Sequence, residues 1–292
     1  MNKVVVLLLL STFMAGCHST GVDQEQQDTF ASLRCWQFRD QSSITREQVN
    51  YIRNRSDNGD LQCKTLLGDL YERGHGVAQD VPKAKALYQS VAEVNASAYY
   101  QLGRMEEEGI GGPPDYVKAR AFYQRATAKP GNSESTTRLA RLMEEGKGGP
   151  EDLQGALQLY LSALASSVGD AWKGIDRLRG KGLVLSAEQE QRYNKVWVDT
   201  TTYRLRSKMR SLQMSVSSKL EPGSVGKPLK LQLECIPGSN VPSISLLEGS
   251  GDSAIDQAVL QAMSTYRFSG EPIFPKGQAS WKVIASFYPG SK

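Results

Sequence analysis

The residues of this chain that could do chemistry are mainly clustered carboxylates. Glu106–Glu108 and the pair Glu144–Glu145 place acidic side chains next to one another, and paired carboxylates can serve as general acid and base. The second cluster occupies the same place in its segment as the first. This repetition favours a solvated helix face over a catalytic pair.

Other catalytic or ligand-binding groups are scarce. His18 and His75 are the two histidines, and we expect both to be exposed. The glycine clusters at 109–112 and 146–149 lack the preceding strand and the Lys-Ser/Thr pair of a phosphate-binding loop. No Gly-x-Ser-x-Gly or His-Glu-x-x-His motif is present. The sequence therefore predicts no enzyme, cofactor, metal site or small-molecule substrate, and an enzyme acting on peptidoglycan is the least favoured hypothesis.

Cys17 is the most informative single residue. It follows Lys3, an apolar run from Val4 to Leu10 and the small residues Ala15 and Gly16, as in a secretory signal. The ending Ala-Gly-Cys resembles the bacterial lipobox. This resemblance implies cleavage after residue 16, lipidation of Cys17 and a tether over 17–30. His18 at the next position favours the outer membrane, facing the periplasm. An ordinary secreted protein is the alternative.

Three further cysteines remain. Cys35 and Cys63 are separated by 28 positions around one predicted helical unit, and an exported chain meets an oxidising compartment. We predict a disulfide between them. Cys235 lies in an alternating strand-like run, which favours a buried thiol.

Residues 66–182 contain three copies of one pattern. The glycines that end the first helix of each copy are 35 and 37 residues apart, and three other landmarks follow the same intervals. Such a period predicts stacked helical hairpins. The glycines suit left-handed helix caps, the aspartates suit N-caps, and the alanines and tyrosines share one face. The landmarks are Gly74, Gly109 and Gly146; Asp80, Asp115 and Asp152; Ala84, Ala119 and Ala156; and Tyr88, Tyr123 and Tyr160.

This pattern resembles the Sel-one-like repeat, a relative of the tetratricopeptide repeat. The first copy, Leu67 to Asp80, is nearly the family form, whereas the next two insert Gly-Pro after the glycines. The resemblance implies an α-helical solenoid over 31–197 that binds other proteins. A purely structural solenoid is the alternative.

A different pattern begins at residue 198. Residues 203–220 predict an amphipathic helix, 229–235 and 241–247 a β-hairpin, 253–266 a second helix and 280–288 a last strand. Ser253 and Asp256 have the spacing of a capping box. The sequence therefore predicts a small α+β domain over 198–292, made of helix, β-hairpin, helix and strand.

The stretch 248–268 resembles the C-terminal domain of the TonB and TolA energy transducers. The matching features are a Ser-Gly turn, Ile255-Asp256, Ala258, Ala262 and the exit Tyr266-Arg-Phe. The resemblance implies docking of a partner protein, often at a sheet edge. The inner-membrane helix and long spacer of the transducers are missing from the pattern, so energy transduction is not implied.

Charge and composition complete the prediction. The formal net charge of +4 over 292 residues gives no reason to expect a nucleic-acid partner. We expect a lipid-anchored adaptor whose partners are other envelope proteins, with the membrane contacted through lipid. A periplasmic immunity or inhibitor lipoprotein, which neutralises one toxin or hydrolase, is the alternative.

Overall fold

The computed structural model describes residues 33–39, 41–128, 132–166, 169–217 and 227–289. The chain forms two compact units, Met1–Val91 and Ala92–Lys292. The predicted signal peptide, Cys17 and the predicted tether lie outside the described residues. Among the helices of the described part, none combines the length and the apolarity that crossing a membrane requires.

The first unit contains a helical segment at 33–39 and three labelled helices, α2 (Arg46–Asp57), α3 (Leu61–Arg73) and α4 (Val81–Val91). Helix α3 ends at Gly74, whose φ of 69° is left-handed, and glycine adopts this conformation without a Cβ clash. Cys35 and Cys63 form a disulfide, so the segment 33–39 is bonded to α3.

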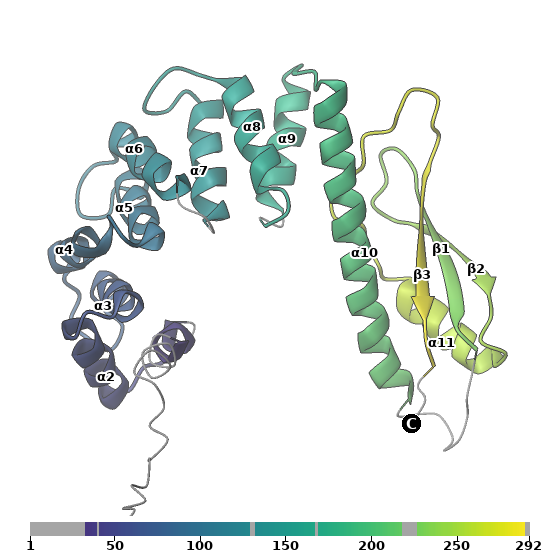
Figure 1. Ribbon diagram of the computed structural model, residues 1–292, viewed down its shortest axis with the longest axis horizontal. Helices are drawn as coiled ribbons and strands as arrows, with labels where there is room; N and C mark the ends of the chain where they lie inside the picture. Colours follow the sequence, from purple (N-terminus) through teal and green to yellow (C-terminus); the bar gives the residue numbers. More distant parts are fainter. Residues whose placement is uncertain (1–32, 40, 129–131, 167–168, 218–226, 290–292) are drawn as a thin grey trace, which may run out of the picture. The chain divides into compact units, whose positions relative to one another are not determined.

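The second unit begins with two helical hairpins and one further helix. Their bounds are α5 (Ala96–Glu108), α6 (Tyr116–Thr127), α7 (Ser133–Glu144), α8 (Leu153–Ala163) and α9 (Asp170–Gly180). Helix α5 contacts α7, and α7 contacts α9, so these three form one layer with α6 and α8 behind it (Figure 1). We call α5, α7 and α9 the inner helices of this unit.

The landmark aspartates begin the second helix of each hairpin. The carboxylates of Asp80, Asp115 and Asp152 accept the backbone N–H of Lys83, Lys118 and Gly155 at 2.9, 3.0 and 2.7 Å. Three N–H groups that the helices leave without an intrahelical partner are thereby satisfied.

Helix α10 (Ala187–Ser217) is longer than the sequence pattern suggests. Its 31 residues begin 16 residues before the predicted start at 203, and it runs without a break through the predicted domain boundary at 197 and 198. Leu205, Met209 and Leu212 form its buried stripe as expected. The rest of the predicted stripe, Val216 and Leu220, carries no described side chains.

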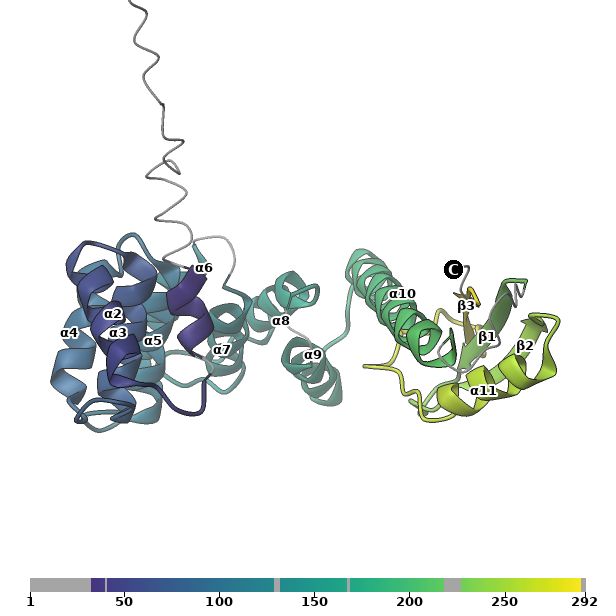
Figure 2. The same cartoon turned by 90° about the horizontal axis from the view of Figure 1, so that it is seen from below.

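A three-stranded antiparallel sheet follows, made of β1 (Leu229–Cys235), β2 (Ser243–Glu248) and β3 (Trp281–Phe287) in the order β2-β1-β3. Leu229 pairs with Phe287 and Cys235 with Trp281. Helix α11 (Ser253–Met263) contacts β2, while α10 contacts β3 (Figure 2). The alternating burial of β1 turns Leu229, Leu231, Leu233 and Cys235 toward the core.

The cap of α11 differs from the prediction. Asp252, not Ser253, is the N-cap, and its carboxylate accepts the N–H groups of Ala254 and Ile255. Asp256 is not the distal member of a capping box, because its carboxylate accepts both the backbone N–H and the hydroxyl of Ser250, at 2.8 and 2.6 Å. The turn before α11 is therefore bonded to the Asp256 carboxylate, which the sequence pattern assigned to the N-terminal cap of the helix.

One apolar core connects the last repeat helices with the sheet. It runs from Ala140 on α7 to Phe287 on β3. The Trp172 ring meets Tyr193 edge-on with centroids 4.7 Å apart. Tyr193 and Trp197 of α10 donate hydrogen bonds to the backbone carbonyls of Glu271 and Gly270, at 2.8 and 3.2 Å. The repeats α7–α9 and the sheet therefore pack as one body.

Candidate interaction surface

Each repeat contains a buried tyrosine that is bonded to a glutamate. Tyr88, Tyr123 and Tyr160 are at most 1% exposed. Their hydroxyls donate to Glu72, Glu107 and Glu144 at 3.1, 2.6 and 2.9 Å, each glutamate lying 16 residues earlier. The glutamates end the first helix of a hairpin and the tyrosines lie on the second, so each bond ties the two helices together.

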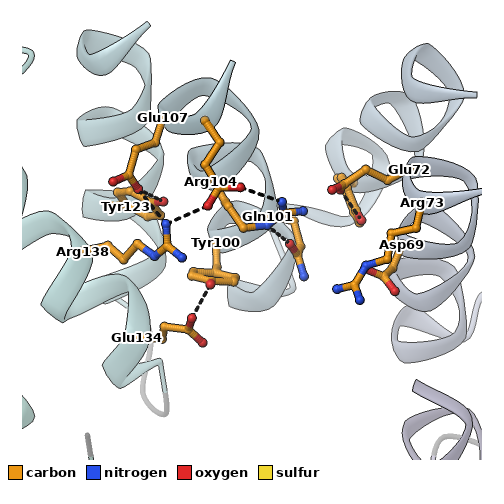
Figure 3. A network of polar contacts seen from close by, with 12 residues as sticks. Asp69, Glu72, Arg73, Tyr100, Gln101, Arg104, Glu107, Tyr123, Glu134 and Arg138 are labelled. Atoms are coloured by element: carbon orange, nitrogen blue, oxygen red, sulfur yellow. Dashed lines mark hydrogen bonds and ion pairs between the residues drawn. The ribbon is translucent and has the colours of Figure 1, made fainter. Parts of the chain in front are cut away.

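Arginines of the next repeat complete two of these sites in the second unit. Arg138 of α7 donates to Glu107 at 3.1 Å (Figure 3). Arg141, on the same helix, donates to Glu107 at 2.8 Å. Arg177 of α9 contacts both oxygens of Glu144 at 3.1 and 2.8 Å. Charge-assisted bonds are the strong class of hydrogen bond, and the Arg177–Glu144 pair is also bidentate. The Tyr-Glu-Arg groups therefore join successive repeats as well as the helices within one.

The protonation states of these groups follow from their surroundings. Burial alone would raise the pKa of Glu107, but hydrogen bonds from Tyr123, Arg141 and Arg138 outweigh it and hold the pKa below the usual value. The same balance, with Arg177 and Tyr160, lowers the pKa of Glu144. Burial, reinforced by the glutamates, raises the pKa of Tyr123 and Tyr160. The glutamates are thus ionised and the tyrosines protonated at neutral pH.

Glycines make room for two of the tyrosine rings. A Cβ atom at Gly103 would lie 2.6 Å from the Tyr123 ring, and one at Gly174 would lie 2.4 Å from the Tyr160 ring. Both distances are shorter than a carbon–carbon contact allows. The first unit repeats the arrangement, since a Cβ at Gly68 would lie 2.6 Å from Tyr88.

Polar side chains also cover the exposed side of the inner helices. The Tyr100 hydroxyl on α5 donates to Glu134 on α7 (Figure 3). Arg104 bonds Gln101 and Glu108 along α5, at 3.0 and 3.1 Å. Tyr100 lies 6.0 Å from the Arg138 guanidinium, measured to its ring centroid.

A cavity of about 150 Å³ opens between α7 and α9. Its polar lining combines guanidinium donors with carboxylate acceptors. Arg141 and Arg177 are 46% and 47% exposed, so their remaining N–H groups face solvent. The lining residues are Glu134, Thr137, Arg138, Arg141, Tyr160, Asp170 and Arg177.

This arrangement suits recognition better than acid–base chemistry. Catalysis by proton transfer works best when a group titrates near the working pH, whereas the pKa values of Glu107 and Glu144 are lowered and those of the tyrosines raised. The described residues hold no cluster of three or more His, Cys, Asp or Glu that could bind a metal ion. Mixed donors and acceptors on a rigid helix layer can bind polar groups of a protein surface.

The sequence matches the Sel1 repeat family at residues 62–93, 96–129 and 133–167. The three matched segments lie between residues 62 and 167 and contain the hairpins described above, which we call the Sel1-like repeats. A crystal structure of a Sel1 repeat protein from Oxalobacter formigenes is similar at 20% identity and a TM-score of 0.47, over 60% of this chain and 75% of that one.

A second similar structure is a protective antigen with an SLR fold present in uropathogenic Escherichia coli strains. Identity is 23% and the TM-score 0.37, and the match covers 51% of this chain and 35% of that protein. No curated protein matches the chain. Sel1 repeats are scaffolds for protein–protein interaction and are typically not catalytic.

The predicted landmarks of the Sel1-like repeats lie within and between their hairpins. Ala84, Ala119 and Ala156 are fully buried. Gly109 and Gly146 have φ values of 71° and 64°, in the left-handed region. The remaining landmark residues are the caps and tyrosines described above. Cys17 lies outside the described residues.

The expected solvated face of the glutamate clusters is only partly present. Glu108 and Glu145 are exposed, whereas Glu106 and Glu144 are 8% and 2% exposed and the Glu107 side chain is 9% exposed. His75 is only partly exposed, and its Nε2 atom is buried. The repeat period could have predicted a structural role for these glutamates, because Glu72, Glu107 and Glu144 follow the same 35- and 37-residue intervals as the glycines.

Tyr99, Tyr100 and Tyr116 lie outside the repeat landmarks. Tyr99 is 3% exposed and packs against Phe122, with ring centroids 6.3 Å apart. Tyr100 and Tyr116 are partly exposed. Tyr99 is thus a packing residue, while Tyr100 belongs to the polar surface of the inner helices.

Proposed function

We propose that this chain is an outer-membrane lipoprotein, facing the periplasm, that assembles envelope proteins. The observation that carries the binding role is the polar surface of α7 and α9 with its cavity of about 150 Å³. The lipid anchor at Cys17 and the location rest on the sequence of residues 1–18. Secretion, polysaccharide export and envelope maintenance are processes that such an adaptor would serve.

The C-terminal sheet is the second proposed docking module. Its resemblance to the TonB and TolA domains concerns residues 248–268. Strands β2 and β3 are the outer strands in the order β2-β1-β3, and most of β2 is exposed. An outer strand offers backbone groups to an added strand, which supports docking of an extended partner segment there.

Site-specific photo-crosslinking in the living host tests the binding surface. A photoreactive residue at Lys173, exposed on α9 beside Asp170 and Arg177, should capture the partner. The matched control carries the same residue at Val117 on α6, which is 67% exposed and lies in the other layer.

The captured proteins distinguish the candidate functions. Several subunits of one envelope apparatus, crosslinked through Lys173 and not through Val117, support the adaptor. A single toxin or hydrolase in a stoichiometric complex identifies the inhibitor instead. Equal capture at both positions contradicts the assignment of the binding surface.

A further inference from the structure

The helical segment 33–39 presents two different faces. Cys35 is fully buried, and Phe38 packs edge-on against Tyr51 with ring centroids 6.0 Å apart. Leu33 and Trp36, also one turn apart, are 50% and 54% exposed. One face therefore contacts the repeat and the other presents apolar side chains to the outside.

The disulfide fixes this orientation. Because Cys35 is bonded to Cys63 on α3, the segment cannot turn over and bury Trp36 without breaking the Cys35 and Phe38 contacts. A tryptophan that is held half-exposed in this way is unusual for a side chain with so much apolar area. Its ring can contact a surface outside the unit.

The segment itself carries two positive charges, and Asp40 follows it directly. Arg34 and Arg39 are exposed, with the Arg39 guanidinium 5.5 Å from the Trp36 ring and that of Arg34 5.2 Å from the Tyr51 ring. The segment contains no acidic residue, and the described part of the first unit has nine basic and six acidic residues. An anionic surface complements this charge.

We infer that Leu33, Arg34, Trp36 and Arg39 form a patch that contacts the surface of an anionic lipid bilayer. Tryptophan prefers the membrane–water interface, and basic residues next to it are attracted by anionic headgroups. The inference rests on the proposed lipid anchor. Cys17 precedes Leu33 by 16 residues, a length that spans at most about 55 Å when fully extended.

The anchor makes a small patch effective. Two apolar and two basic side chains give weak binding from free solution. A covalent link to the same membrane raises the local concentration of lipid to the millimolar range or above. The patch would then hold the first unit close to the membrane.

Fluorescence quenching by brominated lipid tests the contact. The lipidated protein, purified from host membranes, is reconstituted into phosphatidylethanolamine–phosphatidylglycerol vesicles with bromine on the upper acyl chain. Trp172 and Trp197 are 3% and 0% exposed, so we expect the quenching to come from Trp36. Trp36→Phe should remove at least half of it, and Arg34→Gln with Arg39→Gln should reduce it. Trp281→Phe, the control, should leave the quenched intensity unchanged.

Two outcomes separate the patch from the anchor. Equal quenching in wild type and Trp36→Phe, with the protein still bound to vesicles, overturns the patch and leaves the anchor intact. Mass spectrometry that finds no lipid on Cys17 overturns the anchor. In that case the quenching of wild type and of Trp36→Phe is compared at saturating vesicle concentration. Lower quenching in Trp36→Phe supports the patch, and equal quenching overturns it.

Discussion

The Sel1-like repeats and the C-terminal sheet are stabilised in different ways. The repeats bury ionised Glu107 and Glu144, each bonded to a tyrosine of its own hairpin and to an arginine of the next one. The sheet instead buries the apolar face of β1 against Phe287, Ile255 and other apolar side chains. Apolar burial is non-directional, whereas the ion pairs require one register between repeats. The comparison indicates that polar contacts set the register between successive repeats, whereas burial of apolar area stabilises the sheet.

The largest expected effect comes from the apolar region. Phe287→Ala removes a fully buried ring from β3 and should lower the free energy of unfolding by about 3–5 kcal/mol. Because α9, α10 and the sheet share one core, amide hydrogen exchange should rise in all three. Ile284→Ala, on the same strand but 59% exposed, is the control. Increased exchange in the sheet alone would show two separately folding parts.

A glycine substitution tests the close approach within one hairpin of the Sel1-like repeats. Gly103→Val places its Cβ 2.6 Å from the Tyr123 ring, so we expect a loss of about 2–3 kcal/mol by overpacking, measured by urea unfolding. Gly112→Ala is the control, because nothing lies within 4 Å of its Cβ. Equal urea midpoints for the two variants would contradict the packing argument.

Removing one hydroxyl tests the polar groups directly. Tyr160→Phe leaves Glu144 bonded to Arg177 but deletes the hydrogen bond of 2.9 Å to Glu144 and the one of 3.0 Å that the hydroxyl accepts from Arg177, so a loss of about 1–2 kcal/mol is expected. The double variant with Arg177→Met completes a mutant cycle. A coupling energy near zero would mean that the tyrosine and the arginine act independently.

The smallest effect is a dependence on pH. The folded pKa values of Glu107 and Glu144 are lowered from 4.5, so their contribution is present above pH 4.5 and is lost as the pH falls through the folded values. The urea concentration at the midpoint of unfolding should therefore decrease as the pH is lowered below 4.5. Glu144→Gln should show a shallower fall than wild type, and parallel curves would exclude this linkage for Glu144.

The sequence predicted the parts of the repeats that are local. The roles of helix caps such as Asp115 and of left-handed residues such as Gly109 are determined by neighbours within four residues. The common period of four landmarks then predicts where the hairpins lie. The burial of Glu144 depends on Arg177, which is 33 residues away. A glutamate pair at a helix end gives no local sign of such a partner, so it was interpreted as solvent-exposed.

In the C-terminal part, alternation predicted the strands, but it could not give their order. The order β2-β1-β3 depends on pairing between Cys235 and Trp281, far apart in the chain. The start of α10 was missed because its buried side chains, Tyr193 and Trp197, are aromatic residues that contact the segment at 270–271. These two residues and the buried Thr201 continue the stripe of Leu205 and Met209 at steps of four residues, but the polar Thr201 interrupts its apolar pattern in the sequence.

The direction of the ion pairs gives the array a polarity. Glu107 forms ion pairs with Arg138 and Arg141, and Glu144 with Arg177. Each carboxylate is therefore paired with arginine from the repeat that follows it in the chain. A truncation after α8 would remove Arg177, which pairs with Glu144. Removal of a repeat before α7 would leave the Glu144–Arg177 pair intact. Glu107 and Glu144 therefore keep their cations when the chain is shortened from the amino-terminal side of α5, but Glu144 loses Arg177 when α9 is removed.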